Sequence, residues 1–405
     1  MNQKTIGFFS SKPFVERSFR SLNHSIYTKF LRDVDFLREY YQPLLSKNLP
    51  VRTIGIENLK STTSHHDHQP CPTITFKQFL SNYSNLERSG PFNLKFIDAR
   101  LTESTLGLAE GCDYITVFVN DNVNRNALKL LKSQFGVKCI ALRSAGYNNV
   151  DLSAATEFGI KVCRVPEYSP GATADFTIAM IMALNRKIHR AFQRIKDGEF
   201  SLEGLMGFDM NTKVFGIIGG SGKIGKLVCK CLKMGFGARV MVYDSFKDPD
   251  LVKMGIEFVD VLDDLYAQAD VLSLHCPLIK GVTEHMINSN SIKKMKKGVM
   301  IVNTARGGLI VTEDVIDGLK SGQIGSLGLD VYEFEHELFF EDRREQIIID
   351  DTFMRLLTFP NVIVTPHQAF FTNEAINNIA QTTLESLYSF EASGGFITPN
   401  VCLNE

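Results

Sequence analysis

Three apolar segments, each predicted to be a buried strand, are followed at once by a side chain that could take part in catalysis. These side chains are Arg306 after Gly298–Asn303, Glu333 or Glu335 after Ser326–Asp330, and His367 after Asn361–Thr365. An arginine can bind a carboxylate bidentately and polarise a carbonyl group. A histidine can exchange a proton near neutral pH, and a neighbouring carboxylate favours its protonated form. Such a set suits the interconversion of a 2-oxo and a 2-hydroxy acid, provided that a hydride donor binds beside it.

The hydride donor is indicated by a G-x-G-x-x-G motif made of Gly220, Gly222 and Gly225. An apolar strand precedes the motif and a helical pattern follows it, which is the context that a dinucleotide requires. The first glycine allows a tight turn, the second lets the backbone touch the pyrophosphate, and the third lets helix and strand pack closely. The next strand ends at Asp244, whose carboxylate could accept hydrogen bonds from a ribose and repel the extra phosphate of NADP. Lys247 could weaken this discrimination, yet the sequence favours NAD.

Each catalytic candidate also has a structural explanation. A single arginine at a strand end is usually a surface residue, and a histidine after a proline is more often packed or solvated than catalytic. His275 also ends a predicted strand, but we expect it to line the nicotinamide pocket or to support the turn there. The catalytic interpretation depends on the joint occurrence of Arg306, an acid and His367 at the ends of strands, where ligands of such sheets bind.

The elements that must position these residues alternate between short apolar strands and amphipathic helical patterns, which predicts parallel sheets covered by helices on both faces. The first half contains the strand candidates Lys4–Phe9, Leu94–Asp98, Tyr114–Val119, Lys138–Leu142 and Ile160–Val165. The second half adds Lys213–Gly219, Arg239–Asp244, Ile256–Val259, Asp270–His275, Gly298–Asn303, Ser326–Asp330 and Asn361–Thr365. We therefore predict an α/β protein with two doubly wound domains and a cleft between them.

Composition excludes several classes of function. The chain has 405 residues, enough for two domains, and 44 basic against 45 acidic side chains, so neither a nucleic acid nor a membrane surface is an expected partner. The eight cysteines form no C-x-x-C pair, which is typical of free thiols in a reducing compartment. No secretory leader is evident, and the longest apolar run, Phe176–Leu184, is too short to span a bilayer. We expect a cytoplasmic enzyme.

Two stretches need separate treatment. Pro170–Phe200 has a long helical pattern that is apolar almost all round at its start, which fits either an interdomain core helix or a helix that packs against a second subunit. Ser21–Pro91 fits neither domain and is predicted to be an insertion. Its cluster of His65, His66, Asp67 and His68 could bind a transition metal, but adjacent histidines more often lie in a solvated loop, so no metal is expected.

The motifs resemble those of a known family. Asn303–Gly307 (NTARG), Gly328–Glu335 (GLDVYEFE) and Thr365–Phe370 (TPHQAF) look like three signature motifs of the D-isomer-specific 2-hydroxyacid dehydrogenases. Ala141–Leu152 and the stretch from Ala191 to Leu205 resemble the D-lactate dehydrogenase branch in particular. The resemblance covers nearly the whole chain apart from Ser21–Pro91. It implies NADH-dependent reduction of pyruvate to D-lactate, or of a larger 2-oxo acid.

The resemblance also implies roles for individual residues. Arg306 would bind the substrate carboxylate and polarise the keto oxygen, His367 would donate the proton, and Glu335, rather than Glu333, would pair with His367. Around the substrate it implies backbone groups of Ala145 and Gly146, and the side chains of Tyr168 and Phe370. Around the cofactor it implies Lys223 and Ile224 at the pyrophosphate, Asp244 at the ribose, Cys276, Pro277 and Thr283 on the adenosine side, and Thr304, Ala305 and Asp330 at the nicotinamide.

The family organisation implies a discontinuous, flavodoxin-like substrate domain of residues 1–169 and 369–405, a Rossmann NAD domain of residues 170–368, and a homodimer through the 170–200 helix. Two departures stand out. An extra glycine in the Gly219–Gly220 pair puts the phosphate contacts around Ser221 in doubt, and Val311 replaces a frequent Asp, which leaves Thr312 as the candidate helix cap.

Other members of the family are alternatives. A phosphoglycerate dehydrogenase often carries a C-terminal regulatory domain, whereas this sequence stops soon after His367, and a formate dehydrogenase would have Gln in place of Glu335. An enzyme for a larger 2-oxo acid remains open because pocket size does not follow from sequence. A protein of another class, an NAD-sensing scaffold like the corepressors of this family, could keep the same residues. Turnover of pyruvate with NADH separates the two classes.

Overall fold

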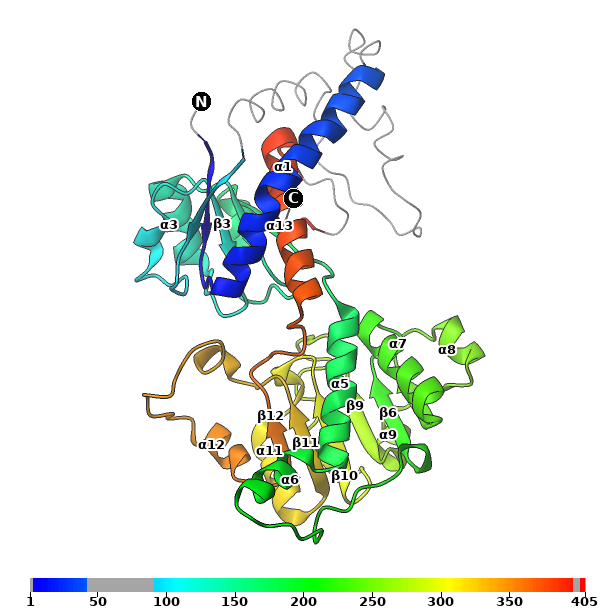
Figure 1. The fold of residues 1–405 in the computed structure, drawn as a ribbon. Helices are drawn as coiled ribbons and strands as arrows, with labels where there is room; N and C mark the ends of the chain where they lie inside the picture. Colours follow the sequence, from blue (N-terminus) through cyan, green and yellow to red (C-terminus); the bar gives the residue numbers. More distant parts are fainter. Residues whose placement is uncertain (1–2, 42–90, 396–400, 405) are drawn as a thin grey trace. The chain divides into compact units, whose positions relative to one another are not determined.

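The computed structural model describes residues 3–41, 91–395 and 401–404, which form two compact units (Figure 1). The first unit comprises Met1–Tyr168 and Asn373–Glu405, and the second comprises Ser169–Thr372. The first unit is therefore discontinuous: in the sequence, the residues of the second unit separate its two parts. Both units are built on a parallel sheet, as the alternation of strands and helices predicts.

The first unit contains a sheet of five parallel strands in the order β2-β1-β3-β4-β5, the order of flavodoxin-like folds. Their bounds are β1 Thr5–Phe8, β2 Asn93–Phe96, β3 Tyr114–Val117, β4 Cys139–Leu142 and β5 Lys161–Arg164. The central strands are buried along their whole length, which is why they are apolar runs without alternation.

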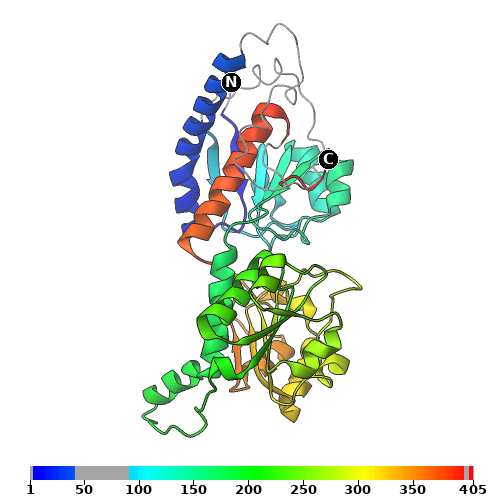
Figure 2. The same cartoon turned by 90° about the vertical axis from the view of Figure 1, so that its right-hand side faces the viewer.

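Helices cover both faces of this sheet. On one face lie α1 (Pro13–Tyr41) and α13 (Asn373–Ser393), which run side by side in Figure 2. On the other face lie the short helix Leu106–Ala109, α3 (Arg125–Phe135) and α4 (Leu152–Glu157). The two halves of the unit are thus joined by packing of the first helix of the chain against its last.

Residues 21–41, the first part of the stretch that is predicted to be an insertion, belong to α1 and so continue a helix of the first unit. Asn23, Ile26 and Tyr27 are buried, and the two apolar side chains join the core that α1 shares with α13. In the sequence, polar residues separate these buried residues, so their helical spacing does not stand out as an apolar run. The rest of the predicted insertion, including the cluster of His65 to His68, lies outside the described residues.

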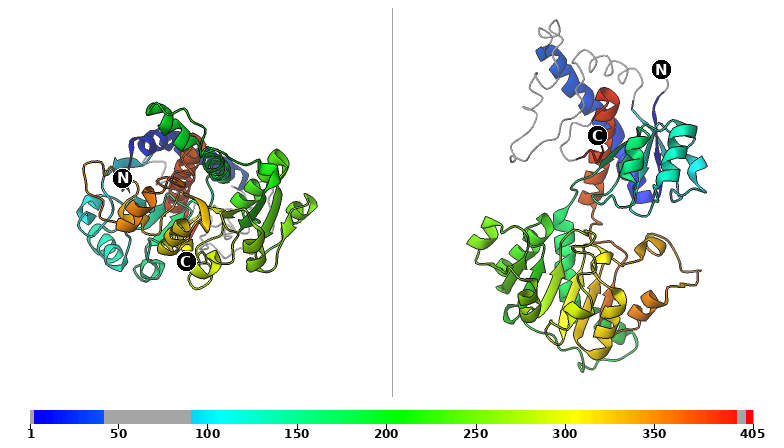
Figure 3. Two further views of the ribbon diagram at one scale, coloured as in Figure 1. Left: turned by 90° about the horizontal axis from the view of Figure 1, so that it is seen from below. Right: turned by 180° about the vertical axis from the view of Figure 1, so that it is seen from behind.

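The second unit contains a sheet of seven parallel strands in the order β12-β11-β10-β9-β6-β7-β8. The strands are β6 Val214–Ile218, β7 Arg239–Tyr243, β8 Glu257–Phe258, β9 Val271–Leu274, β10 Val299–Asn303, β11 Ile324–Leu329 and β12 Val362–Val364. The right-hand view of Figure 3 shows them alongside one another. The direction of winding reverses between β6 and β9, the point at which ligands bind in this class of fold.

Helices cover both faces of the second sheet as well. One face is covered by α5 (Pro170–Asn185) and α7 (Lys223–Lys230). The other is covered by α9 (Leu262–Gln268), α10 (Ser289–Ile292), α11 (Thr312–Ser321) and α12 (Asp351–Leu357). The short helix α8 (Pro249–Lys253) follows β7. Within the described part of the chain, no helix has the length and apolarity needed to cross a membrane.

The long helical pattern predicted over Pro170–Phe200 is interrupted. The helix α5 ends at Asn185, and Lys187 has a φ of 50°, which turns the chain before α6 (Ile188–Lys196) begins. The first helix is apolar because it packs on the sheet through residues such as Met180 and Ile181. The second helix has no buried residue and projects from the unit (Figure 2).

A buried polar cluster connects α1 to the rest of the first unit and permits a test of its role. Asn23 donates a hydrogen bond to the carbonyl of Phe92 (2.8 Å) and accepts one from the hydroxyl of Tyr388 (2.6 Å). We predict that Asn23→Ala lowers the free energy of unfolding by about 1–3 kcal/mol, because both partners lose a buried hydrogen bond. Calorimetry should show this loss, with His24→Ala on the exposed side of the helix as control. Equal stability of the two variants would contradict the prediction.

Candidate functional site

The turn after β6 requires a glycine, and the residue that makes this turn is Gly219. Its φ is +83°, and a Cβ there would lie 2.6 Å from the carbonyl carbon of His275. Its N–H donates to the carbonyl of Tyr243 (2.9 Å), continuing the pairing of β6 with β7. We had predicted that Gly220 makes this tight turn. The extra residue after the strand moves the turn one position earlier, because the first residue after the strand is the one that must reverse direction.

At two of the remaining glycines a side chain would collide with the protein itself. A Cβ at Gly220 would lie 2.7 Å from Val242, and one at Gly225 would lie 2.2 Å from the carbonyl oxygen of Gly219. Gly222 is the N-cap of α7, whose first two residues are Lys223 and Ile224. Free N–H groups at a helix start attract phosphate, so this turn at the carboxyl edge of the sheet fits a pyrophosphate.

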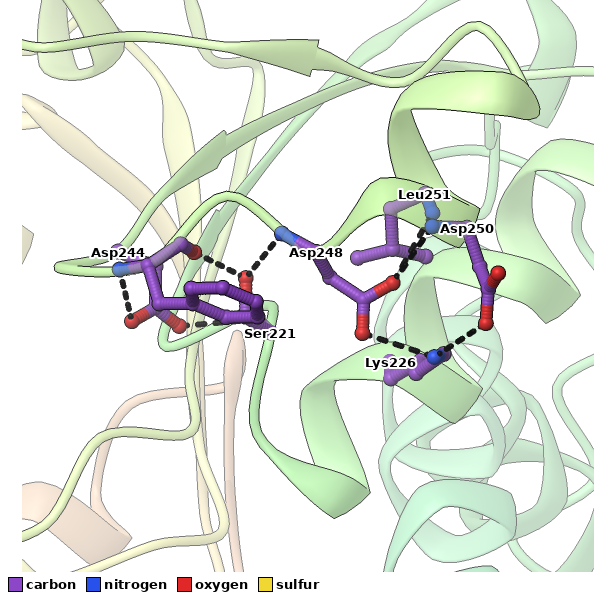
Figure 4. A network of polar contacts seen from close by, with 7 residues as sticks. Ser221, Lys226, Asp244, Asp248, Asp250 and Leu251 are labelled. Carbon is purple, nitrogen blue, oxygen red and sulfur yellow. Dashed lines mark hydrogen bonds and ion pairs between the residues drawn. The ribbon is translucent and has the colours of Figure 1, made fainter. Parts of the chain in front are cut away.

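Asp244 follows β7 and lies beside the glycine turn (Figure 4). Its Oδ2 atom accepts a hydrogen bond from the N–H of Ser221 at 2.9 Å. Its Oδ1 atom has only two long contacts, both at 3.4 Å, to the hydroxyl of Ser245 and the N–H of Phe246. Because a carboxylate can accept about four hydrogen bonds, Asp244 retains capacity for the hydroxyls of a ribose.

The segment after β9 forms a closed loop that contains three predicted cofactor residues. The hydroxyl of Thr283 donates to the carbonyl of Pro277 (2.6 Å) and accepts from the N–H of Ile279 (2.7 Å). Burial raises the pKa of Cys276 to about 11, so its thiol stays protonated at neutral pH. At the start of this loop, burial lowers the pKa of His275 to about 4. His275 is therefore neutral near pH 7, which makes it a poor proton donor.

The turn that carries Arg306 follows β10 and is organised by the buried Asn303. The side chain of Asn303 accepts from the N–H of Ala305 (3.0 Å) and donates to the carbonyl of Arg306 (2.8 Å). The hydroxyl of Thr304 lies 2.8 Å from that of Thr177 in α5. A Cβ at Gly307 would lie 2.1 Å from the carbonyl group of Tyr332, so the arginine turn packs directly on the segment that carries the acids.

The structure pairs His367 with Glu335. The Nδ1 atom of His367 lies 2.8 Å from the Oε1 atom of Glu335, and both side chains are largely buried. The Oε2 atom of Glu335 accepts from the N–H of Tyr332 (3.0 Å), which fixes the carboxylate. The imidazole is thus held through Nδ1, and Nε2 is the atom that can carry a proton to another group.

Glu333 serves a different purpose from Glu335. Its Oε1 atom lies 2.8 Å from Nε2 of His285, and its Oε2 atom accepts from both the N–H (3.1 Å) and the hydroxyl (3.0 Å) of Thr312. The expectation that Thr312 caps the following helix is wrong, because Val311 occupies the N-cap position without a side-chain bond and Glu333 accepts from the helix start. The predicted choice of Glu335 as the partner of His367 therefore agrees with the geometry.

Asp330 supports the segment around His367. Its buried carboxylate accepts from the hydroxyl of Thr365 (2.6 Å) and from the N–H groups of Gln368 (2.9 Å) and Ala369 (2.8 Å). Burial raises the pKa of Asp330, although these hydrogen bonds act in the opposite direction. The carboxylate thus bonds to the chain on both sides of His367, a role that the sequence did not indicate.

The predicted substrate residues belong to both units. Ala145 and Gly146 follow β4 in the first unit, where their carbonyl groups accept from Arg164 (3.0 Å) and from Ser144 (2.7 Å). Tyr168 is the last residue of the N-terminal part of the first unit. Phe370 is buried and belongs to the second unit, together with Arg306 and His367. Within the second unit, the arginine turn, the acid segment and the histidine segment come together, as predicted.

Two residues of this region were missed by sequence reasoning. Gly219 makes the turn, and Ser221 connects Asp244 with the segment that follows it. The signal for Gly219 was present, since a glycine that directly follows a strand is the natural place for a turn with positive φ. No signal pointed to Ser221, because its partners lie 23 and 25 residues away in the sequence.

Comparison with known proteins agrees with this geometry. Residues 178–369 match the model of the family "D-isomer specific 2-hydroxyacid dehydrogenase, NAD binding domain". The chain is 51% identical over 312 residues to a 2-hydroxyacid dehydrogenase homolog of Haemophilus influenzae, covering 77% of this chain and 92% of that protein. It is 50% identical over 316 residues to the D-lactate dehydrogenase of Escherichia coli K12, covering 78% of this chain and 94% of that protein.

A solved structure of the pyruvate reductase of Chlamydomonas reinhardtii has the same fold. It superposes with a TM-score of 0.73 at 35% sequence identity, and the match covers 96% of each chain. Sequence identity of this level across almost the full length of relatives, together with the glycine turn and the paired histidine, establishes the family. The chain belongs to the D-isomer-specific 2-hydroxyacid dehydrogenases, with their NAD-binding domain in its second unit.

Proposed function

We propose that the protein is a D-lactate dehydrogenase, which reduces pyruvate to D-lactate with NADH and catalyses the reverse reaction with NAD. The observation that carries this proposal is the 2.8 Å contact between His367 and Glu335 in the unit that also holds Arg306. The 50% identity with the Escherichia coli D-lactate dehydrogenase supports pyruvate as the substrate over larger 2-oxo acids.

The proposed chemistry follows from the positions of Arg306, Glu335 and His367, each of which follows a different strand of the sheet. Arg306 would bind the substrate carboxylate and polarise the keto oxygen, which lowers the barrier to attack at the carbonyl carbon. His367 would donate the Nε2 proton to the oxygen as negative charge develops there. Glu335 holds Nδ1 and so fixes the orientation of the imidazole ring.

The residues around the glycine turn fit NAD. Lys223 and Ile224 would meet the pyrophosphate at the start of α7, and Asp244 would accept from the ribose. The cofactor, when bound, supplies the hydride that reaches the carbonyl carbon. We propose the loop of Cys276, Pro277 and Thr283 for the adenosine side, and Thr304, Ala305 and Asp330 for the nicotinamide side. We also propose that Ala145, Gly146, Tyr168 and Phe370 contribute to substrate binding.

We further propose a homodimer in the cytoplasm. The exposed face of α6 is apolar: Ile188, Phe192 and Ile195 recur at helical spacing and are each more than half exposed. Phe200, Leu202 and Met206 continue this surface beyond the helix. An apolar patch of this kind is typical of a protein interface. All seven cysteines in the described residues are free, which fits a reducing compartment.

We predict that His367→Ala lowers the turnover of pyruvate by about 100- to 10,000-fold, because the reaction loses its proton donor. NADH oxidation followed by absorbance measures this directly, and binding of NADH provides the control for folding. Wild-type protein that binds NADH but oxidises none of it with pyruvate would refute the proposed function. Near-normal turnover in the variant would refute only the assignment of His367.

We predict that Glu335→Gln lowers turnover at least about tenfold, because the imidazole of His367 loses the carboxylate that holds its Nδ1 atom. Glu333→Gln is the matched control, since it lies two residues away and pairs with His285 instead. It should keep near-normal turnover. A larger loss in Glu333→Gln than in Glu335→Gln would reverse the assignment of the two acids.

We predict that replacing Phe192 and Ile195 together by Glu converts a dimer into a monomer, because the apolar face of α6 then carries negative charge. Light scattering after size exclusion should give twice the 45.4 kDa chain mass for the wild type and a single chain mass for the variant. Val261→Glu, at another exposed apolar position, should remain dimeric. A wild type that is monomeric at all concentrations would rule out this interface.

A further inference from the structure

The turn after Asp244 is connected to the glycine turn by a network that none of the roles above uses (Figure 4). The hydroxyl of Ser221 donates to the carbonyl of Phe246 and accepts a long hydrogen bond from the N–H of Asp248 (3.4 Å). The N–H of the same serine donates to Asp244. The position of the ribose-binding acid is thus coupled to the position of Asp248 by a single residue of the glycine turn.

Asp248 and Asp250 bind the ammonium group of Lys226, which lies in the first half of α7. The distances from the Lys226 Nζ atom are 2.8 Å to Asp248 and 2.9 Å to Asp250. The other oxygen of Asp248 accepts from the N–H groups of Asp250 (2.9 Å) and Leu251 (3.3 Å) and caps α8. The lysine is three-quarters buried and is therefore held in place between two carboxylates.

The charges in this cluster are all present at neutral pH. Burial alone would raise the pKa of Asp248, but the hydrogen bonds from Lys226 and from backbone N–H groups outweigh it, so that the pKa is lowered. The same lysine lowers the pKa of Asp250, and the two carboxylates raise the pKa of Lys226. A second lysine on the turn, Lys247, also contacts a carboxylate, that of Asp260, at 2.6 Å.

A 2′-phosphate on the adenosine ribose is the feature that separates NADP from NAD. It carries close to two negative charges and binds best where a lysine or arginine can meet it. Asp244 repels this phosphate, but a repulsive acid alone does not exclude NADP, since a nearby cation could offset the repulsion. Lys226 is linked to the turn that carries Asp244 through Asp248 and Ser221, and its ammonium group is already bound by two acids.

We propose that Asp248 and Asp250 are specificity-determining residues, which exclude NADP by keeping Lys226 away from the 2′ position of the adenosine ribose. This inference depends on the proposed placement of the ribose at Asp244. It differs from the role of Asp244 itself, because the two acids act on a cation of the protein and not on the ribose. Lys226 is then a group that could bind a phosphate if the two acids released it. The preference for NAD over NADP depends on the position in which they hold its ammonium group.

The test is the affinity of the full chain for NADH and NADPH, measured by calorimetry without substrate. In Asp248→Asn with Asp250→Asn, the dissociation constant for NADPH should fall by about tenfold or more relative to that for NADH, because Lys226 is released. Asparagine at 248 can still cap α8. Adding Lys226→Met should abolish the gain, and the gain should shrink with increasing salt. Asp244→Ala serves as the positive control for a weakened NAD preference.

A charge-matched control separates a local effect from a general one. Glu257→Gln with Asp317→Asn also removes two negative charges, from ion pairs with Arg239 and Lys320 elsewhere on the second unit. It should leave the NADH to NADPH ratio unchanged. If the double variant fails to fold, Asp250→Asn alone, at an exposed carboxylate, should give a smaller gain in the same direction.

The outcomes distinguish the two proposals. Failure of the wild type to bind NADH would refute the proposed function. A wild type that binds NADH, with folded variants whose ratio equals that of the wild type, would overturn the role of Asp248 and Asp250 alone. A gain that survives Lys226→Met, or that also occurs in the charge-matched control, would likewise overturn it.

Discussion

The chemistry of the second unit depends on one constraint, which is that all seven strands of its sheet are parallel. Parallel pairing sends every carboxyl end to the same edge, so residues from distant parts of the sequence arrive together without any long loop. The glycine turn, Asp244, Arg306 and His367 each follow a different strand. The inner strands β9 and β10 are buried along their whole length, so packing fixes the register at the centre of the sheet, and the residues that follow these strands inherit that fixed position.

The segment around His367 shows how the edge of the sheet holds a residue with a strained backbone conformation. His367 has a φ of +54°, a conformation that costs a non-glycine residue about 1–3 kcal/mol. Asp330 accepts three hydrogen bonds from this segment, two of them from the residues directly after His367. These three hydrogen bonds fix the chain on both sides of His367. The backbone is therefore held where Nδ1 meets Glu335.

The sequence predicts much of this arrangement, and its failures have physical causes. All twelve described strands overlap segments that apolar runs indicate, because buried parallel strands have few other patterns available. The packing of residues 21–32 is hard to predict because polar residues separate the apolar side chains that α1 buries, and the break at Lys187 is hard to predict because a single residue of positive φ leaves no trace in hydrophobic spacing. The glycine turn lies one residue before the first glycine of the G-x-G-x-x-G motif, because Gly219 is the residue that directly follows β6.

Neighbouring acids are the residues that sequence alone separates least well. Glu333 and Glu335 follow the same strand two residues apart, yet one accepts from a helix start and the other holds His367. Asp244 and Asp248 follow another strand four residues apart, yet one oxygen of Asp244 has long contacts at 3.4 Å, whereas Asp248 binds Lys226 at 2.8 Å. In each pair the difference lies in the partner, which comes from an element far away in the chain. A carboxylate already bonded to a lysine or a helix start has little capacity left for a ligand, so partner assignment decides which acid acts on the substrate or cofactor.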